Sequence, residues 1–100
     1  MTKTLSDNDI NKALKDLPHW KIDDLHGVAC IARHLMFENF VETFAFMSQV
    51  AELAEHSDHH PNWCNVYNQL DIKLSTHDAG GLTIKDFKLA LEIEHLLNHG

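Results

Sequence analysis

The chain has few basic residues and no long apolar run, and each shortage excludes a class of protein. Eight Lys and Arg oppose fifteen Asp and Glu, for a formal net charge of −7. The basic residues are also scattered, so we expect no direct binding of nucleic acid, which needs a clustered positive surface. No apolar run approaches the length of a membrane span, and the first ten residues lack the apolar segment of a secretory signal.

Cysteine is scarce as well. Cys30 and Cys64 are the only two, and they lack the CxxC spacing of a metal or redox motif. Isolated thiols without a signal segment are typical of a reduced, cytoplasmic protein, which is the localisation we predict. Cys64 lies between a tryptophan and a strand start, where we expect a small buried residue rather than a nucleophile. One hundred residues predict a single domain, residues 1–100.

Helical and strand-like patterns alternate along the chain. Helical spacing covers residues 5–18, 38–57 and 82–100, with Ser6 as the N-cap of the first helix and Thr83 of the last. Residues 19–23, 28–37 and 65–77 have strand character, with Val66, Leu70, Ile72 and Leu74 on one face of the last segment. That last segment is either one strand or two short strands broken near Asn68. This order predicts a two-layer α+β fold, an antiparallel four-stranded sheet with helices packed on one face.

The helix at 38–57 has an unusually broad apolar surface. Its polar residues Glu38, Glu42, Gln49 and Glu52 share one narrow sector, and apolar residues from Phe40 to Ala54 cover most of the rest. Deep burial inside one chain is one interpretation. A chain of this length has little protein to cover both sides of a helix, so we favour self-association through it.

Histidine is abundant, and three of the nine histidines fall within five residues: His56, His59 and His60, followed by Pro61. We expect Pro61 to end the preceding helix. A zinc site is one interpretation, but HExxH is absent, the proline disfavours helical geometry at His60, and no paired cysteine supports a four-ligand site. We therefore predict no metal.

Acid–base chemistry is the other interpretation, because histidine exchanges protons near neutral pH. His59 and His60 follow a helix, and His77 ends the polar face of a strand, so the three could converge on a cleft or stay solvated. Two acids, Glu55 and Asp86, fall in apolar sectors at helix ends, where a charge needs a partner. Asp86 could equally cap its helix with Thr83, and the helix could fray at Glu55. Aromatic residues that could stack on a flat ring, or simply pack in the core, are Trp20, Trp63 and Tyr67.

The stretch "EHSDHHPNWCNVYNQLDIKLSTHDAGGLTIKD" resembles the signature of the pterin-4a-carbinolamine dehydratases. The pattern is a glutamate, His-His-Pro after three residues, a tryptophan, Val-Tyr-Asn, Thr-His, a glycine turn and an aspartate. The matching residues are Glu55, His59, His60, Pro61, Trp63, Val66, Tyr67, Asn68, Thr76, His77, Gly81 and Asp86. The resemblance extends upstream through Trp20 and covers nearly the whole chain.

The resemblance implies an enzyme that eliminates water from a 4a-hydroxytetrahydropterin to give the quinonoid dihydropterin. The hydroxylated pterin is a by-product of aromatic amino-acid hydroxylases, so a functional link to such an enzyme is implied, and no cofactor is needed. It also implies a homodimer or homotetramer, with strands pairing across subunits and helices packing between dimers. The preferred side chain of the pterin stays open.

The resemblance also assigns roles to residues. His59, His60 and His77 would be catalytic, with His59 the main acid, His77 a second proton-transfer group and His60 orienting the ring. The substrate-binding residues would be Glu55, Pro61, Trp20, Ser75, Thr76 and Asp86. One departure is Lys85, where the family often has arginine, and His56 lies outside the pattern. Because some family members also act as dimerisation cofactors for a transcription factor, a non-catalytic binding module is the alternative function.

Overall fold

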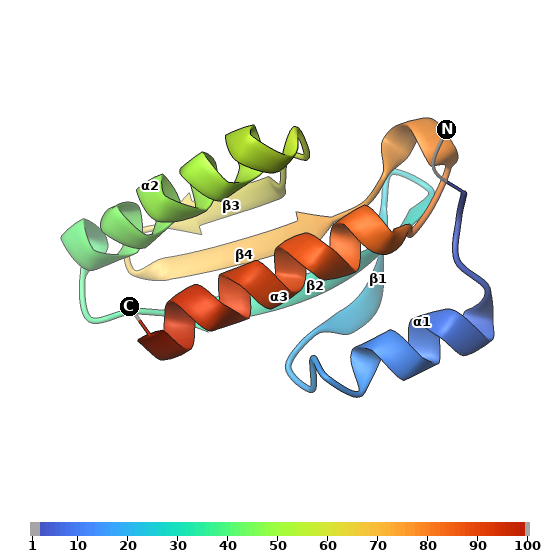
Figure 1. Ribbon diagram of the computed structural model, residues 1–100. Helices are drawn as coiled ribbons and strands as arrows, with labels where there is room; N and C mark the ends of the chain where they lie inside the picture. The colour runs from blue at the N-terminus through green and yellow to red at the C-terminus, as the bar shows by residue number, and fades with distance from the viewer. Residues whose placement is uncertain (1–2, 100) are drawn as a thin grey trace.

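The structure, a computed structural model, describes residues 3–99 (Figure 1). These residues form three helices and four strands. They are α1 (Asp7–Leu14), β1 (Lys21–Leu25), β2 (Val28–Met36), α2 (Phe40–Ser57), β3 (Asn62–Val66), β4 (Gln69–Leu74) and α3 (Ile84–His99), with a short 3₁₀ helix at His77–Ala79. In the described part of the chain, no helix is long and apolar enough to cross a bilayer.

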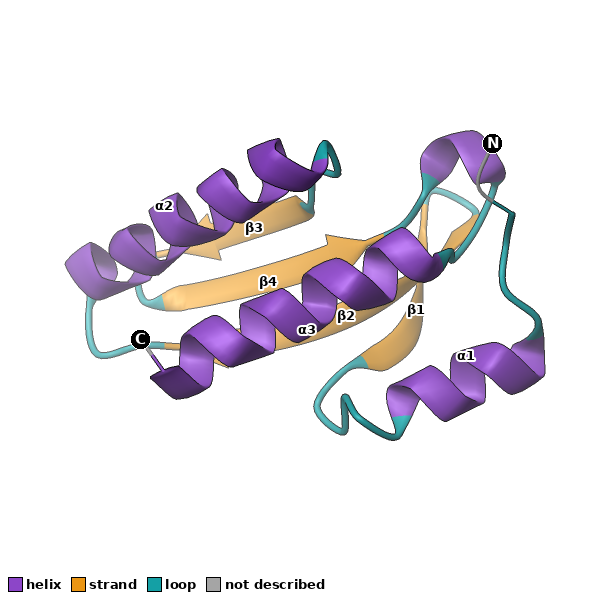
Figure 2. Ribbon diagram, viewed as in Figure 1, coloured by secondary structure: helices purple, strands orange, loops and turns teal. Residues whose placement is uncertain are grey.

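The four strands form one antiparallel sheet in the order β1-β2-β4-β3. Figure 2 shows α2 and α3 side by side on one face of this sheet, with α2 over β3 and α3 over the central strands. The predicted α+β class, with helices on an antiparallel four-stranded sheet, is confirmed. The two helices run in opposite directions, so the end of α2 and the start of α3 lie at the same end of the molecule.

The core lies between the sheet and these helices. In the register of β2 with β4, Ile31 pairs with Leu74 and Leu35 with Leu70, and all four side chains are buried. They meet Phe46 and Val50 of α2 and Leu89 and Ile93 of α3. The apolar side chains of the sheet thus face those of α2 and α3, and their burial holds both helices on the sheet.

The hairpin from β3 to β4 corrects one prediction. Val66 was expected on the same face as Leu70, but it is exposed, on the open face of the sheet. Val66 pairs with Gln69 across the two-residue turn, and paired residues share a face, so the turn reverses the alternation. Cys64 shares that open face and is exposed, which also corrects its predicted burial.

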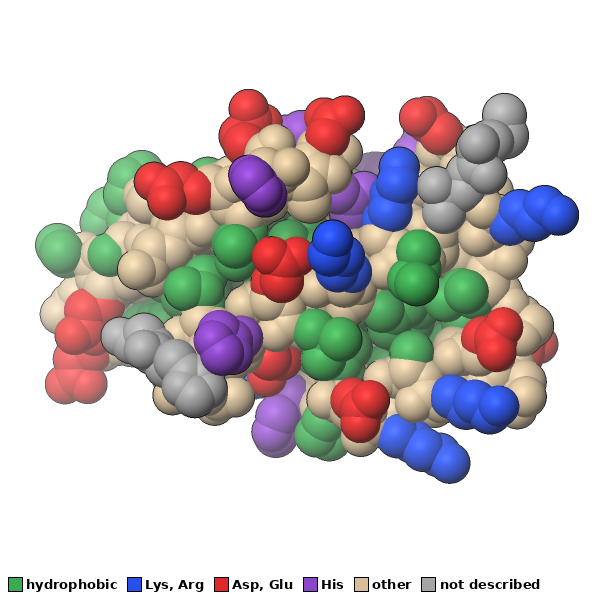
Figure 3. Space-filling model, viewed as in Figure 1, with side chains coloured by type: hydrophobic (Ala, Val, Ile, Leu, Met, Phe, Trp, Pro, Cys, Tyr) green, Lys and Arg blue, Asp and Glu red, His purple; other side chains and the backbone are tan. Residues whose placement is uncertain are grey.

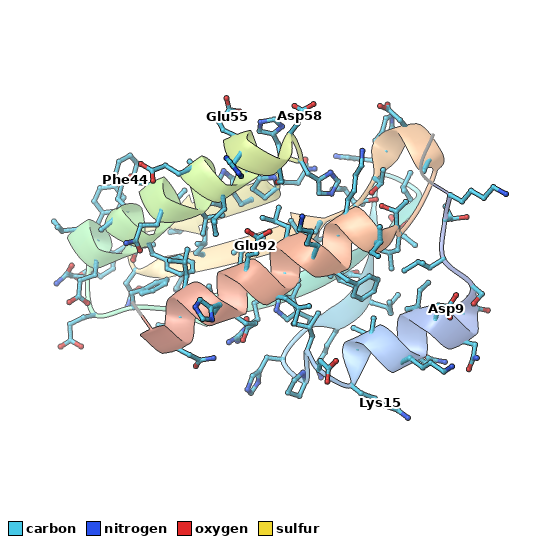
Figure 4. The ribbon with its side chains drawn as sticks, viewed as in Figure 1. Asp9, Lys15, Phe44, Glu55, Asp58 and Glu92 are labelled. Atoms are coloured by element: carbon cyan, nitrogen blue, oxygen red, sulfur yellow. The ribbon has the colours of Figure 1, made fainter. Side chains whose placement is uncertain are left out.

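The broad apolar surface of α2 is only partly used within this chain. Phe46, Val50 and Ala54 face the core, whereas Phe40, Val41 and Phe44 are 46%, 76% and 55% exposed. Figure 4 shows Phe44 on the outer side of α2. Deep burial of this helix within one chain is therefore wrong, and an apolar strip stays open to solvent.

Candidate functional site

The end of α2 sets the position of His59. Asp58 takes a left-handed conformation (φ 51°), which aspartate tolerates better than most residues. The backbone N–H of Asp58 donates to Glu55 O at 3.3 Å and that of His59 to Ala54 O at 3.0 Å, the paired bonds of a Schellman motif. Asp58, rather than the expected Pro61, therefore ends the helix.

Asp86 is placed by the start of α3. Its carboxylate accepts a hydrogen bond from the backbone N–H of Thr83 at 2.9 Å, while Lys85 N donates to the Thr83 hydroxyl at 3.3 Å. This reciprocal arrangement is a capping box, as the sequence indicated. Unlike most capping acids, Asp86 is fully buried. A buried carboxylate is stable only with several hydrogen-bond donors.

Those donors come from three places: the start of α3 itself, the loop after β4 and the loop after α2. Besides Thr83 N, the Thr76 hydroxyl donates to Asp86 Oδ2 at 2.9 Å, and His59 Nε2 lies 2.6 Å from Oδ1. His59 is itself only 9% exposed. Because a carboxylate only accepts, Nε2 of His59 carries the hydrogen, and Nδ1 is the nitrogen left to exchange a proton with a ligand.

A second histidine–carboxylate pair lies outside the core. His60 Nε2 is hydrogen-bonded to Glu55 Oε2, and both side chains are exposed. Figure 4 shows Glu55 pointing away from the sheet at the end of α2. The expectation that Glu55 is an acid in an apolar environment is therefore wrong, whereas it is right for Asp86. His56 is also exposed, as expected.

His77 follows Thr76 directly and begins the 3₁₀ helix, so the chain brings it next to the buried network. Its side chain is exposed, and its ring forms no hydrogen bond with residues 3–98. Gly80, in a left-handed conformation (φ 79°), turns the backbone so that Thr76 N bonds Gly81 O at 3.0 Å. The closed loop fixes the direction in which Thr76 and His77 leave the sheet.

Three other predicted binding residues have different surroundings. The Ser75 hydroxyl donates to Ala29 O of β2 at 2.9 Å, and Pro61 is half-buried after His60. Trp20 is buried, and its indole N–H donates to Glu94 of α3 at 3.0 Å. Glu94 is eight residues along α3 from Asp86, roughly 12 Å at the helical rise, so the structure does not bring Trp20 to the His59–Asp86 pair.

A pocket of about 320 Å³ opens beside His59, between the end of α2 and the first half of α3. This volume is within the range of small-molecule sites. Its lining combines apolar and charged residues: Ser57, His59, Ile84, Lys85, Lys88, Leu89 and Glu92. Figure 3 shows Lys or Arg, His and acidic side chains close together on this part of the surface.

A larger hollow, of about 640 Å³, lies on the open face of the sheet. It contains His34 and Asp71, whose side chains lie 2.6 Å apart but are both more than half exposed. Water competes for the hydrogen bonds of exposed pairs of this kind, so such pairs contribute little to stability. We place the candidate site at the smaller pocket because only there does a buried carboxylate orient a histidine.

Sequence reasoning missed two features of this site. Lys88 was not singled out, although it lies three residues after Lys85 and so shares its helix face. The buried Thr76–Thr83 contact, 2.7 Å between hydroxyl oxygens, was not expected because Thr83 had been considered only as a cap. Its seven-residue separation from Thr76 includes the glycine turn, and only the folded loop brings the two together.

The fold and the site together define a small α+β domain with a buried imidazole–carboxylate pair beside a pocket. Residues 3–96 match the family described as Pterin 4 alpha carbinolamine dehydratase, and the chain belongs to this family. Curated relatives include a Prochlorococcus marinus protein, with 44% identity over 98% of this chain and 99% of the relative. Another is a Rhodopseudomonas palustris protein, with 48% identity over 90% of this chain and 87% of the relative. Both are named "Putative pterin-4-alpha-carbinolamine dehydratase".

Solved structures share the fold. A transcriptional coactivator/pterin dehydratase from Brucella melitensis has a TM-score of 0.85 and 37% identity, covering 94% of this chain and 98% of that one. A pterin dehydratase-like protein, described as a RuBisCO assembly factor in the alpha-carboxysome, has a TM-score of 0.66 and 20% identity. The match covers 81% of this chain and 92% of that one. The second likeness concerns the fold alone.

Proposed function

We propose that this protein dehydrates 4a-hydroxytetrahydropterins to quinonoid dihydropterins by histidine acid–base catalysis and so supports tetrahydropterin recycling. In this elimination the C4a–O bond breaks, the hydroxyl leaves as water after protonation, and a base removes the N5 proton. One acid and one base near neutral pH are sufficient, and each positioned group typically contributes about 10²–10⁴-fold.

The observation that carries the proposal is the buried His59–Asp86 pair beside a pocket of suitable size. Asp86 holds Nε2 of His59, which leaves Nδ1 for the departing hydroxyl. The same hydrogen bond fixes the orientation of the imidazole ring beside the pocket. His59 is therefore our choice for the main acid.

The remaining roles follow the family pattern. We assign His77, exposed after Thr76, as the second proton-transfer group, and His60, held by Glu55, as the residue that orients the ring. Thr76 and Asp86 act through the position of His59, and Ser75 and Pro61 stay proposed contacts of the pterin. Trp20, which is buried against Glu94, is not proposed as a contact. A pterin is also the only small-molecule partner that we propose.

The test follows dehydration of freshly generated 4a-hydroxytetrahydropterin by absorbance. We expect the wild type to exceed the spontaneous rate, and the double variant His59→Ala, His77→Ala to lose that acceleration. His56→Ala is the matched control, since His56 is an exposed histidine of the same segment outside the family pattern. A wild type that gives only the spontaneous rate on several pterins overturns the proposal.

The exposed apolar strip on α2 favours a second candidate function, a non-catalytic binding module. Phe40, Val41 and Phe44 could bind a partner helix by their apolar surface, and the Brucella melitensis relative is described as a transcriptional coactivator as well as a pterin dehydratase. The same strip would equally serve homodimers or homotetramers. Full catalytic activity in a protein that captures no partner in a pull-down counts against the module.

A further inference from the structure

Two exposed lysines line the pocket beside His59. Lys85 and Lys88 both line it, and neither forms an ion pair among residues 3–98. The chain has only eight Lys and Arg against fifteen acids. Two of these few cations therefore face one pocket without a protein partner.

Neither lysine is explained by the carboxylate next to it. Asp86 is already satisfied by His59, Thr76 and Thr83, so it does not need Lys85 as a counter-ion. Nor does the helix benefit, because Lys85 lies in the first turn of α3 and Lys88 in the second, near the positive end of the helix dipole. Their charges are better explained by something that binds in the pocket.

The rest of the lining suggests what that ligand is. Ile84, which is 66% exposed, offers an apolar surface to a flat ring, with the buried Leu89 beneath the pocket, and His59 supplies the proton-transfer group. Glu92 is the one acid of the lining, and Figure 4 shows it on the side of α3 toward α2. The lining itself carries two lysines against one glutamate, in a protein of net charge −7.

We propose that this pocket takes a tetrahydropterin whose side chain ends in an anion, a phosphate ester or a carboxylate, bound by Lys85 and Lys88 while His59 faces the ring. The inference rests on the proposed dehydratase function and adds the substrate class. Ammonium groups bind phosphate and carboxylate as point charges without demanding a forked geometry, so lysine is adequate where the family often has arginine.

The test compares three 4a-hydroxytetrahydropterins: the uncharged 6-hydroxymethyl compound, its monophosphate ester and a 6-carboxymethyl compound. At low ionic strength we expect kcat/KM for an anionic substrate to exceed that of the alcohol about tenfold, the size of two partly exposed ion pairs. The advantage should shrink at 1 M salt, where the Debye length is about 3 Å. The anion that gains more is the one that the two lysines prefer.

The double variant Lys85→Met, Lys88→Met should bring the ratio of anionic to neutral kcat/KM close to one. The charge-matched control is Lys12→Met, Lys15→Met at the end of α1, which Figure 4 shows far from α2, and it should keep the ratio. A ratio near one in the wild type, with the alcohol still dehydrated, overturns this inference and leaves the dehydratase intact. A ratio that survives loss of Lys85 and Lys88 overturns it too. No acceleration of any substrate overturns both proposals.

Discussion

Asp86 Oδ1 lies 2.6 Å from Nε2 of His59, although 27 residues separate them in the sequence. The contact joins the loop after α2 to the first turn of α3, and both side chains are buried. It therefore links the orientation of the histidine to the packing of two helices.

Replacing Asp86 with asparagine should reduce both activity and stability. Three donors converge on this carboxylate, and an amide nitrogen cannot accept a hydrogen bond from any of them. We expect kcat to fall about 10²-fold through misorientation of His59, and the free energy of unfolding by about 1–3 kcal/mol. Initial rates and urea titration measure the two effects. Asp78→Asn, at an exposed acid of the 3₁₀ helix, is the control, and wild-type kcat in Asp86→Asn contradicts the role of the pair.

The Thr83 hydroxyl has a defined direction. Since the Thr76 hydroxyl donates to Asp86, the hydroxyl of Thr83 must donate to Thr76, at 2.7 Å. Thr83→Val removes this donor and the acceptor for Lys85 N, so we expect a loss of about 1–2 kcal/mol in urea titration. Thr83→Ser should stay within about 0.5 kcal/mol of the wild type. Equal stability of the Val and Ser variants contradicts this account.

The two thiols should react very differently. Cys64 is exposed, whereas Cys30 has no exposed surface. Burial raises the pKa of the Cys30 thiol; the charge of Lys73 opposes this rise, and the charges of Asp23 and Asp24 add to it. Iodoacetamide at pH 8 should therefore alkylate Cys64 and leave Cys30 until the protein unfolds. Peptide mass spectrometry with and without urea measures this, and rapid native labelling of Cys30 contradicts it.

The raised pKa of Cys30 also predicts a loss of stability in alkali. Above the ordinary thiol pKa of 9.0 the unfolded chain releases this proton before the folded one, so the free energy of unfolding decreases as pH rises. Cys30→Ala should show a smaller decrease between pH 8 and 10, measured by urea titration at each pH. An equal decrease in the two proteins contradicts the assignment to Cys30.

The exposed strip on α2 should mediate self-association. Placing a charge there, as in Val41→Glu with Phe44→Glu, should lower the assembly mass in light scattering, because two charges would lose their hydration at an apolar contact. Glu52→Lys alters an exposed charge of the same helix outside the strip and serves as the control. A wild-type monomer, or an unchanged mass in the double variant, contradicts this use of the strip.

The sequence by itself determined the three helices, the α+β class and the family, because these depend on local periodicity, caps and motif spacing. It did not mark the start of β3, which begins at Asn62 rather than at residue 65. The helical pattern at 38–57, the Thr83–Asp86 cap and the buried row of Leu70, Ile72 and Leu74 are all local signals. They also placed Asp86 among apolar residues, where the structure buries it.

Only the tertiary structure decided which histidine meets which acid. His59 and His60 are neighbours in the sequence, yet His59 is buried against Asp86 and His60 lies outside with Glu55. Adjacent side chains are separated by the left-handed turn at Asp58 and by the packing of α3, neither of which leaves a periodic signal. The position of Lys85 and Lys88 in the pocket of His59 likewise depends on long-range packing. That packing places the end of α2 beside the start of α3 on one face of the sheet.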